Sequence, residues 1–354
     1  MDVTPTRVFL LTHPRTASNL VTRILNLDNQ PALCGPGTDA QKSNNNGYFF
    51  LPTVSRRLEL ADRRSEDWAE EERADISRCL EACTARLVQH AESAEAEGKG
   101  VYVKEHLIWM LSPAAEDLAK GTDLTRDRDC NIVQRKAARE EGEGDTEERE
   151  AQNQTVLPDA FLRTWTPTFL IRHPALVFPS LYRTCVDLEG PEQARKNADG
   201  SFRIEMTWRW SRNLWEWFRR QGNDESTSQW VFGDDKLSGS SWPIILDADD
   251  VILQPDVIKR YCQIVRLDPD RCQFEWESAT AEEQQSLHAV ERRMKSSLLS
   301  STGLIKGKTA VGLDLEREAQ EWKDEFGEEE ARKLLSWVKD AMPDYEFLRE
   351  RRLR

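Results

Sequence analysis

Residues 9–25 read FLLTHPRTASNLVTRIL, and the interpretation of the whole chain depends on this stretch. The apolar run before His13-Pro14 is typical of a buried strand, and an amphipathic helical pattern begins after residue 17. The turn between them carries hydroxyl groups, an amide and one guanidinium at a helix N-terminus, where backbone N–H groups can bind an anion. An ordinary N-cap uses the same residue types, so the turn alone does not identify a ligand.

Charge and composition limit the class of partner. The 354 residues carry a formal net charge of −14, with 38% hydrophobic and 32% charged residues. This balance argues against a general role at nucleic acid or at a membrane surface, and an anionic ligand would need a local basic pocket. No apolar run approaches the roughly 18 residues of a membrane span, and the N-terminus lacks the layout of a signal peptide. We therefore expect neither nucleic acid nor membrane as a partner.

The cysteines favour a reducing compartment. The chain has seven of them, an odd number, and none forms a CxxC pair. Such usage predicts reduced thiols, a cytoplasmic location and no metal site. Cys79 and Cys83 lie one helical turn apart and are expected to face the core.

Four apolar segments alternate with helical patterns, which predicts an α/β fold with a central parallel sheet flanked by helices on both faces. We interpret the chain as a single domain, 1–354, because no composition shift marks a boundary. A charged insertion at about 116–155 includes the mixed-charge run 135–154, which has little to bury and is expected to be mobile. The strands are expected at residues 7–12, 100–107, 166–174 and 241–251, and helices at 17–27, 56–96, 175–186 with a break near Pro179, 203–221, and most of the last 80 residues outside a loop at 300–313.

Three of these strands end in cationic or titratable residues, and ligands of open parallel sheets bind at such ends. The first strand ends before Arg15. The second ends in Lys104 and His106, which lie two residues apart and so point to the same side of an extended chain. The third ends before Arg172, with Ser180 eight residues later.

Each pair also has an ordinary structural explanation, as a surface cation, a buried histidine or a helix serine. The stretch GLIKGKT (303–309) approaches a nucleotide-binding loop but has one residue too few between its glycines and follows no clear strand, which argues against a nucleotide kinase. The convergence of three strand ends is therefore the main signal.

Together these residues resemble the cytosolic sulfotransferase family, whose members transfer a sulfuryl group from 3′-phosphoadenosine 5′-phosphosulfate (PAPS), with PAP (3′,5′-diphosphoadenosine) as product. Residues 14–19 (PRTASN) resemble that family's Pro-Lys-Ser-Gly-Thr-Thr loop, with arginine for lysine and alanine for glycine. Lys104-x-His106 matches its catalytic Lys-x-His, and Arg172-His173-Pro174 with Ser180 matches its Arg-Asn-Pro…Ser pattern. WSRNLWEWF (210–218), PIILDADDV (243–251) and EWKDEF (321–326) resemble later elements in the same order, so the resemblance covers most of the chain. It implies a P-loop-like sulfotransferase fold.

The resemblance also implies a role for each matching residue. His106 would be the general base, Lys104 would bear on the sulfuryl oxygens, and Arg15 would neutralise charge on the bridging oxygen. The nucleotide would be held by the 5′-phosphate loop and the 3′-phosphate residues, which are Arg15, Thr16, Ala17, Ser18, Asn19, Arg172, Ser180, Lys306 and Gly307. No metal is implied.

The chain departs from the family pattern around adenine. Leu20 stands where the family has a stacking tryptophan, and Ala248 stands where it has a tyrosine. Two alternatives therefore stay open, an elimination or cyclisation on the same fold, and a catalytically silent binding protein with an acidic interaction segment at 135–150.

The acceptor is expected to be a small, largely apolar molecule, such as a hydroxylated aromatic, terpenoid or polyketide-like metabolite. The loop at 34–52 and the end of the second strand offer a mostly apolar lining. The residues concerned are Tyr48, Phe49, Phe50, Leu107 and Trp109. The tryptophans of 210–218 are spaced to form a buried helix face rather than a ligand surface. Nothing in the sequence indicates the oligomeric state.

Overall fold

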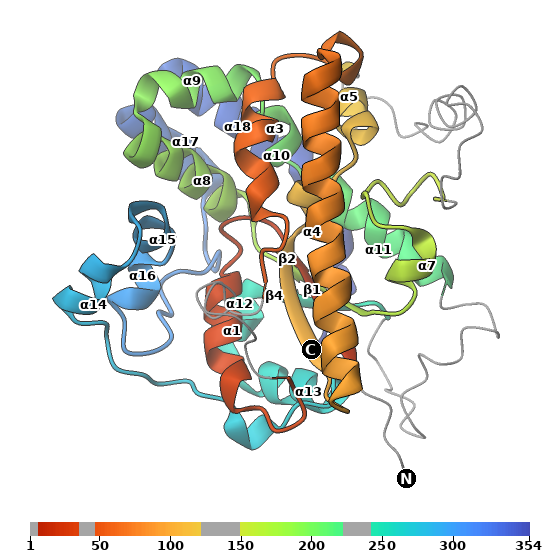
Figure 1. The fold of residues 1–354 in the computed structure, drawn as a ribbon. Helices are drawn as coiled ribbons and strands as arrows, with labels where there is room; N and C mark the ends of the chain where they lie inside the picture. Colours follow the sequence, from red (N-terminus) through yellow and green to blue (C-terminus); the bar gives the residue numbers. More distant parts are fainter. Residues whose placement is uncertain (1–5, 35–46, 122–148, 222–241) are drawn as a thin grey trace.

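The computed structural model describes residues 6–34, 47–121, 149–221 and 242–354, and the statements below concern these residues. Its centre is a parallel sheet (Figure 1), and the strands follow the order β2-β1-β3-β4. Both faces of the sheet are covered, which is why each strand is a nearly continuous apolar run. The strands are β1 Arg7–Thr12, β2 Val101–His106, β3 Thr166–Ile171 and β4 Ile244–Asp247.

Helices follow the strands as the alternating pattern predicts, so the α/β fold with a flanked parallel sheet is confirmed. The helices that carry or support the site are α1 Ser18–Leu25, α4 Glu70–Ala96, α8 Pro174–Glu189, α11 Arg209–Gln221, α12 Ala248–Leu253, α13 Asp256–Ile264 and α15 Ala289–Met294. The remaining α-helices are α3 Val54–Leu60, α5 Pro113–Gly121, α7 Asp159–Leu162, α9 Pro191–Asp199, α10 Phe202–Glu205, α14 Ala281–Ser286, α16 Ser296–Leu299, α17 Leu315–Phe326 and α18 Glu328–Glu350.

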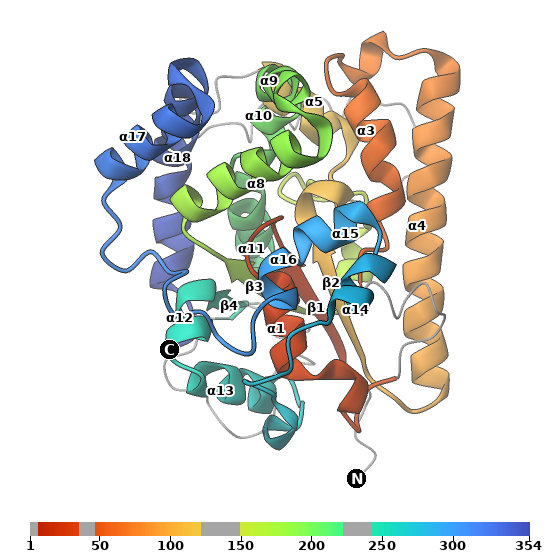
Figure 2. The ribbon, with the colours of Figure 1, turned by 90° about the vertical axis from the view of Figure 1, so that its left-hand side faces the viewer.

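Alternate residues of β1 pack into two separate apolar clusters, one on each face of the sheet. Val8 and Leu10 pack with residues of α1 and α13, whereas Phe9 and Leu11 pack with residues of α4, α8, α11 and α18. In Figure 2, α4 and α18 lie at opposite sides of the view with the strands between them, although both pack in the cluster of Phe9 and Leu11. The two clusters together hold the four strand ends in place relative to one another.

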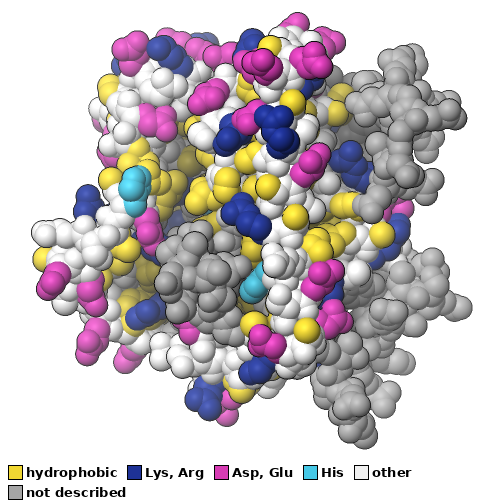
Figure 3. Space-filling model, viewed as in Figure 1, with side chains coloured by type: hydrophobic (Ala, Val, Ile, Leu, Met, Phe, Trp, Pro, Cys, Tyr) yellow, Lys and Arg dark blue, Asp and Glu magenta, His cyan; other side chains and the backbone are white. Residues whose placement is uncertain are grey.

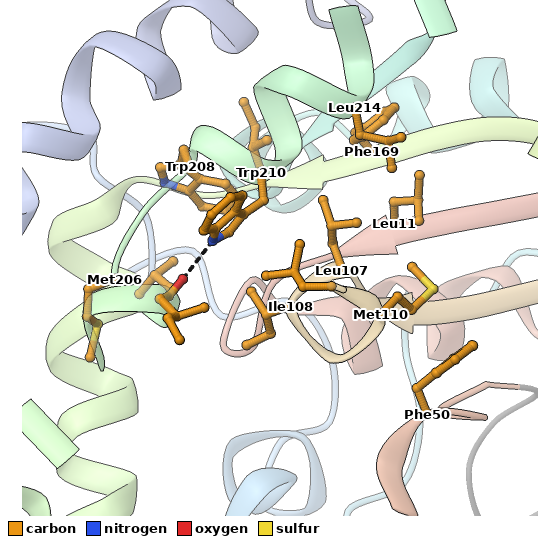
Figure 4. Packing of buried hydrophobic residues seen from close by; sticks show 14 of the residues in the cluster. Leu11, Phe50, Leu107, Ile108, Met110, Phe169, Met206, Trp208, Trp210 and Leu214 are labelled. Atoms are coloured by element: carbon orange, nitrogen blue, oxygen red, sulfur yellow. Dashed lines mark hydrogen bonds between the residues drawn. The ribbon is translucent and has the colours of Figure 1, made fainter. Parts of the chain in front are cut away.

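The tryptophan-rich helix belongs to the larger cluster, as its spacing predicts. Figure 4 shows Trp210 beside Leu107 and Ile108, with its indole Nε1 donating a hydrogen bond to the Ile204 carbonyl at 2.7 Å. Trp215, at 4% exposure, is buried in the same helix. These tryptophans stabilise the face of the sheet behind the site and do not line it.

Several predicted boundaries are wrong. The fourth strand ends at Asp247, because the Asp247 carboxylate caps a helix by accepting a hydrogen bond from the Asp249 N–H group at 2.9 Å. Residues 56–96 form two helices, α3 and α4, and residues 203–221 likewise divide into α10 and α11. The third strand's helix begins at Pro174 and continues through Pro179 without the expected break.

The two ends of the predicted insertion at 116–155 belong to ordered structure. Its first residues complete α5, and Asn153 near its other end is buried and bonds Asp159 and the Leu157 carbonyl. The central part, 122–148, lies outside the described residues, as does most of the acidic segment 135–150. Within the described ranges, no helix has the length and apolar character needed to cross a bilayer.

Candidate active site

The turn after β1 is tight and has two residues in the left-handed region. Arg15 and Ala17 have positive φ angles of 68° and 66°, and the Thr16 hydroxyl donates to the His13 carbonyl at 2.7 Å. Because α1 begins at Ser18, the N–H groups of Ser18 and Asn19 have no acceptor within the helix, whereas those of Leu20 and Val21 donate to the Ala17 carbonyl. A left-handed conformation is unfavourable for an L-residue by about 1–2 kcal/mol, which explains why the resembling loops have glycine where this chain has Ala17.

His13 anchors this loop to a distant segment. Its Nδ1 lies 2.8 Å from the Pro14 carbonyl oxygen, and its Nε2 contacts the Glu205 carbonyl oxygen. The ring is buried, and burial lowers its pKa. The contacts of His13 therefore fix the loop to the segment that contains Glu205.

Arg15 contacts Ser180, whereas the resemblance pairs Ser180 with Arg172. The Arg15 guanidinium donates from Nε to the Ser180 hydroxyl at 3.0 Å and from Nη1 to the Met294 carbonyl at 3.0 Å. The second contact ties α15 to the loop, and α15 also packs against α8. Burial, followed by the nearby guanidinium groups of Arg293 and Arg172, lowers the pKa of Arg15 to about 10.

Arg172 connects two backbone segments at the end of β3. It donates from Nη1 to the Arg15 carbonyl at 3.1 Å and from Nη2 to the Lys308 carbonyl at 2.8 Å. Its Nε is buried and has no hydrogen-bond partner among the residues that the structure describes. Burial lowers the pKa of Arg172, and the nearby carboxylate of Asp249 opposes that shift. An unsatisfied guanidinium N–H group at this position fits an anionic ligand.

The segment after residue 303 reaches this cluster through Lys308. The phosphate contact expected of Lys306 and Gly307 stays a prediction: both are exposed, as Lys308 is, and it is the Lys308 carbonyl that Arg172 bonds. Burial, with the positive charges of Arg172 and Arg15 next, lowers the pKa of the Lys308 ammonium. The Lys308 ammonium thus lies close enough to the guanidinium groups of Arg172 and Arg15 to be affected by their charge.

This cluster contrasts with the net charge of the chain. We call Arg15, Arg172, Arg293 and Lys308 the cationic cluster. On the face shown in Figure 3, acidic side chains lie mainly around the outer parts, and hydrophobic side chains gather in the middle. A protein of net charge −14 thus brings four cations together near the ends of β1 and β3, although Arg293, on α15, also pairs with Asp187 at 2.6 Å. An anionic ligand requires a local concentration of positive charge of this kind.

Lys104 is fully buried near the end of β2. Its ammonium donates to Asn19 Oδ1 at 2.5 Å and lies 4.2 Å from the centroid of the Tyr48 ring. Burial, reinforced by the positive charge of Lys295 and opposed by Glu105, lowers its pKa to about 7. An anion bound beside Lys104 would oppose this shift by stabilising the charged ammonium.

His106 lies at the last position of β2, on the same side as Lys104. The ring centroids of Tyr48 and Trp109 lie 4.8 Å and 4.5 Å from its own, and its Nδ1 is 2.7 Å from Thr12 Oγ1. Burial, followed by the charge of Lys104, holds the pKa of His106 well below its ordinary value. The imidazole is therefore neutral at pH 7 and has a lone pair available for a proton.

The predicted acceptor residues divide into two groups. Tyr48 and Trp109 are partly exposed beside His106. Phe49, Phe50 and Leu107 are buried in the apolar core, with Phe50 wholly inaccessible. Contact with an acceptor stays a prediction for Tyr48 and Trp109, while the other three act as structural support.

Gly47 lets the loop carrying Tyr48 approach β2. The Tyr48 N–H group donates to the Lys104 carbonyl at 3.0 Å, and a Cβ at residue 47 would overlap that carbonyl oxygen. We expect Gly47→Ala to lower the free energy of unfolding by about 1–3 kcal/mol, the range for an overpacked site. Gly307→Ala is the control, because a methyl group there meets no atom within 4 Å. Urea unfolding of both variants tests this; equal stabilities would contradict the close approach.

An open groove runs along residues 274–277 and 300–305, next to the cationic cluster. Trp276 and Leu304 pack against the same apolar cluster as Leu20, and the Arg23 guanidinium lies 6.0 Å from the centroid of the Trp276 ring. The Lys308 N–H group bonds the carbonyl of Ile305 at the end of this groove, at 3.0 Å. The groove thus has Trp276 in its lining and ends at the backbone hydrogen bond between Ile305 and Lys308.

Comparison with known proteins assigns the family. The chain is 38% identical over 355 residues to sulfotransferase ppzF of Metarhizium majus (strain ARSEF 297), with 99% of this chain and 97% of that protein covered. It belongs to the sulfotransferase family. Sulfotransferase ppzF of Metarhizium rileyi (strain RCEF 4871) is also 38% identical to this family member, with the same coverage.

Two further comparisons add no argument about this sulfotransferase. The sulfotransferase domain from the Synechococcus PCC 7002 olefin synthase aligns over 87% of each chain, with 11% identity and a TM-score of 0.33. No protein-family model matches the chain.

Four residues of this sulfotransferase's site were missed by the sequence interpretation. Asp249 bonds the Ala310 N–H group at 2.9 Å and lies near Arg172. Thr12, Trp276 and Lys308 are the others. Thr12 carried a signal, since it ends β1 at the same edge of the sheet. Asp249 and Lys308 lie within the quoted stretches 243–251 and 303–309, but nothing in those stretches indicates that they approach Arg172. Trp276 lies outside every quoted stretch.

Proposed function

We propose that this sulfotransferase moves a sulfuryl group from PAPS to a hydroxyl group of a small, largely apolar molecule, with His106 as general base. One observation carries the proposal. The neutral imidazole of His106, the buried ammonium of Lys104 and the cationic cluster converge on the carboxyl ends of β1, β2 and β3. This is the combination that proton transfer beside a transferred anion requires.

The residues present fit a nucleotide with two phosphate groups. Arg172, Ser180 and Lys308 would hold the 3′-phosphate, and the unsatisfied Nε of Arg172 supports this assignment. Arg15 and the N–H groups at the start of α1 would hold the 5′-phosphate, as helix N-termini commonly do. The groove beside Trp276 offers adenine an aromatic surface in place of the tryptophan that Leu20 replaces. When bound, PAPS supplies the sulfuryl group and a nucleotide leaving group.

His106 would take the proton of the acceptor hydroxyl, which typically contributes about 10²–10⁴-fold to a rate. Lys104 and Arg15 would stabilise negative charge on either side of the transferred group. Arg15 would act as a fixed positive charge rather than as a proton donor, because a guanidinium gives up its proton only at high pH. Tyr48 and Trp109 would form the walls of the acceptor site beside His106.

The experiment is incubation of the purified protein with PAPS and a panel of hydroxylated aromatic, terpenoid and polyketide-like compounds. PAP release and the mass of each product are measured by liquid chromatography with mass spectrometry. We expect PAP and a product that retains sulfate. A product lacking sulfate would favour elimination or cyclisation, and no PAP above the level of a His106→Ala control would contradict sulfuryl transfer for these acceptor classes.

The lowered pKa of Lys104 predicts that nucleotide affinity depends on pH. Its pKa is about 7 in the unliganded site, and a bound anion stabilises the charged form, so binding above pH 7 takes up a proton. We expect the affinity for PAP to fall, by up to roughly tenfold per pH unit, as the pH rises from about 7 to about 9. Calorimetric titration in buffers of different ionisation enthalpy measures the proton uptake. Lys104→Met should abolish it; unchanged uptake in that variant would assign the proton to another group.

A further inference from the structure

The last residues of β1 and β2 face each other across the sheet. Thr12 is paired with His106 in the strand register, and both side chains are buried, with exposures of 1% and 6%. The Thr12 Oγ1 lies 2.9 Å from the Glu105 carbonyl oxygen and 2.7 Å from His106 Nδ1. One hydroxyl group therefore contacts both a backbone carbonyl and the imidazole.

The chemistry of these partners determines the direction of both hydrogen bonds. A carbonyl oxygen only accepts, so the single hydroxyl proton of Thr12 is donated to the Glu105 carbonyl. The hydroxyl oxygen can then only accept from His106, so Nδ1 must carry a proton and donate it in this hydrogen bond. Since a neutral imidazole has one N–H group, Nε2 is left as the acceptor.

We infer that Thr12 is a positioning residue that holds neutral His106 in the tautomer with its proton on Nδ1, so that Nε2 is the basic atom. The link to catalysis rests on the proposed function, whereas the tautomer itself does not. The positive charges of Lys104 and Arg15 disfavour an imidazolium at this site, so the ring must be in one neutral tautomer or the other.

Without the Thr12 hydroxyl group, nothing at Nδ1 would favour one His106 tautomer over the other. The free imidazole side chain favours the tautomer with its proton on Nε2, and that form cannot take a proton at Nε2. Tyr48 and Trp109 flank the ring and would still hold it in place. Removal of the Thr12 hydroxyl would therefore impair the base without removing it from the site.

The experiment compares Thr12→Val with Thr12→Ser, which retains the hydroxyl group. Thr168→Val is the matched control, because Thr168 is also buried and donates to a carbonyl of a neighbouring strand, that of Phe9, at 3.2 Å. Nitrogen-15 NMR of histidine-labelled protein reports the tautomer of each ring. The His106 signals are assigned by their loss in His106→Ala.

We expect wild-type His106 to be protonated on Nδ1, and Thr12→Val to shift it toward protonation on Nε2. With an acceptor, Thr12→Val should lower kcat by roughly 10- to 100-fold with little change in KM for PAPS, as for the outer partner of a functional histidine. Thr12→Ser should restore both readouts, and Thr168→Val should change neither.

A wild-type His106 protonated on Nε2 would overturn the inference, even if Thr12→Val failed to fold. Equal kcat losses in Thr12→Ser and Thr12→Val would also overturn it. If the protein transferred no sulfuryl group at all, the proposed function would fail while the NMR measurement still decided the tautomer.

Discussion

Replacing His106 with alanine is expected to lower the rate of sulfuryl transfer by about 10²–10⁴-fold while leaving PAP affinity nearly unchanged. The reason is that His106 supplies a neutral base, whereas the nucleotide contacts come from Arg15, Arg172 and the start of α1. The measurement is kcat at saturating PAPS, with PAP affinity measured by calorimetry on the same preparations.

His90→Ala is the matched control for that prediction. His90 also stacks on an aromatic ring, that of Phe49 at 5.5 Å, but it lies on α4 away from the strand ends. It should retain full turnover. Wild-type turnover in His106→Ala would remove the general base from the mechanism, and an equal loss in both variants would point to a general packing effect.

Replacing Arg172 with alanine is expected to weaken PAP binding by roughly 100-fold, about 3 kcal/mol, the scale of two hydrogen bonds between charged groups. The variant loses the unsatisfied Nε and also the two bonds that hold the Arg15 and Lys308 carbonyls. Arg172→Lys should give an intermediate affinity, because an ammonium keeps the charge but cannot bridge two acceptors in one plane. Calorimetric titration with PAP measures all three proteins.

Arg183→Ala controls for charge alone. Arg183 lies on α8, near Ser180, but its guanidinium pairs with Glu325 at 2.5 Å in a partly exposed ion pair. Such pairs contribute little, so PAP affinity should change less than about threefold. A loss in Arg183→Ala as large as in Arg172→Ala would show that net charge, and not the strand-end contacts, determines binding.

The residues that sequence could place are those whose spacing is local. Lys104 and His106 share one side of β2 because strand side chains alternate, and Arg172 precedes the helix that carries Ser180. The break expected at Pro179 is absent. Proline removes one hydrogen bond from a helix, but Phe178 and Leu181 beside it are buried in the core and keep the segment helical. Packing outweighs that local penalty.

Contacts between distant segments could not be predicted. The link from Arg172 to Lys308 and the facing of Thr12 and His106 depend on strand register and loop path. The fourth strand was expected to continue to residue 251, whereas the Asp247 cap begins a helix at Ala248. An apolar residue such as Phe50 gives no sign in sequence of whether it lines a pocket or fills the core.

The central claim is that the strand ends bind a nucleotide with a 3′-phosphate, and calorimetric titration of the wild-type protein with PAP tests it most directly. Adenosine 5′-monophosphate, which lacks that phosphate, is the comparison ligand. We predict one PAP bound per chain with micromolar affinity, and binding of the monophosphate at least tenfold weaker. No PAP binding to the folded protein, or equal affinity for the two nucleotides, would contradict the account.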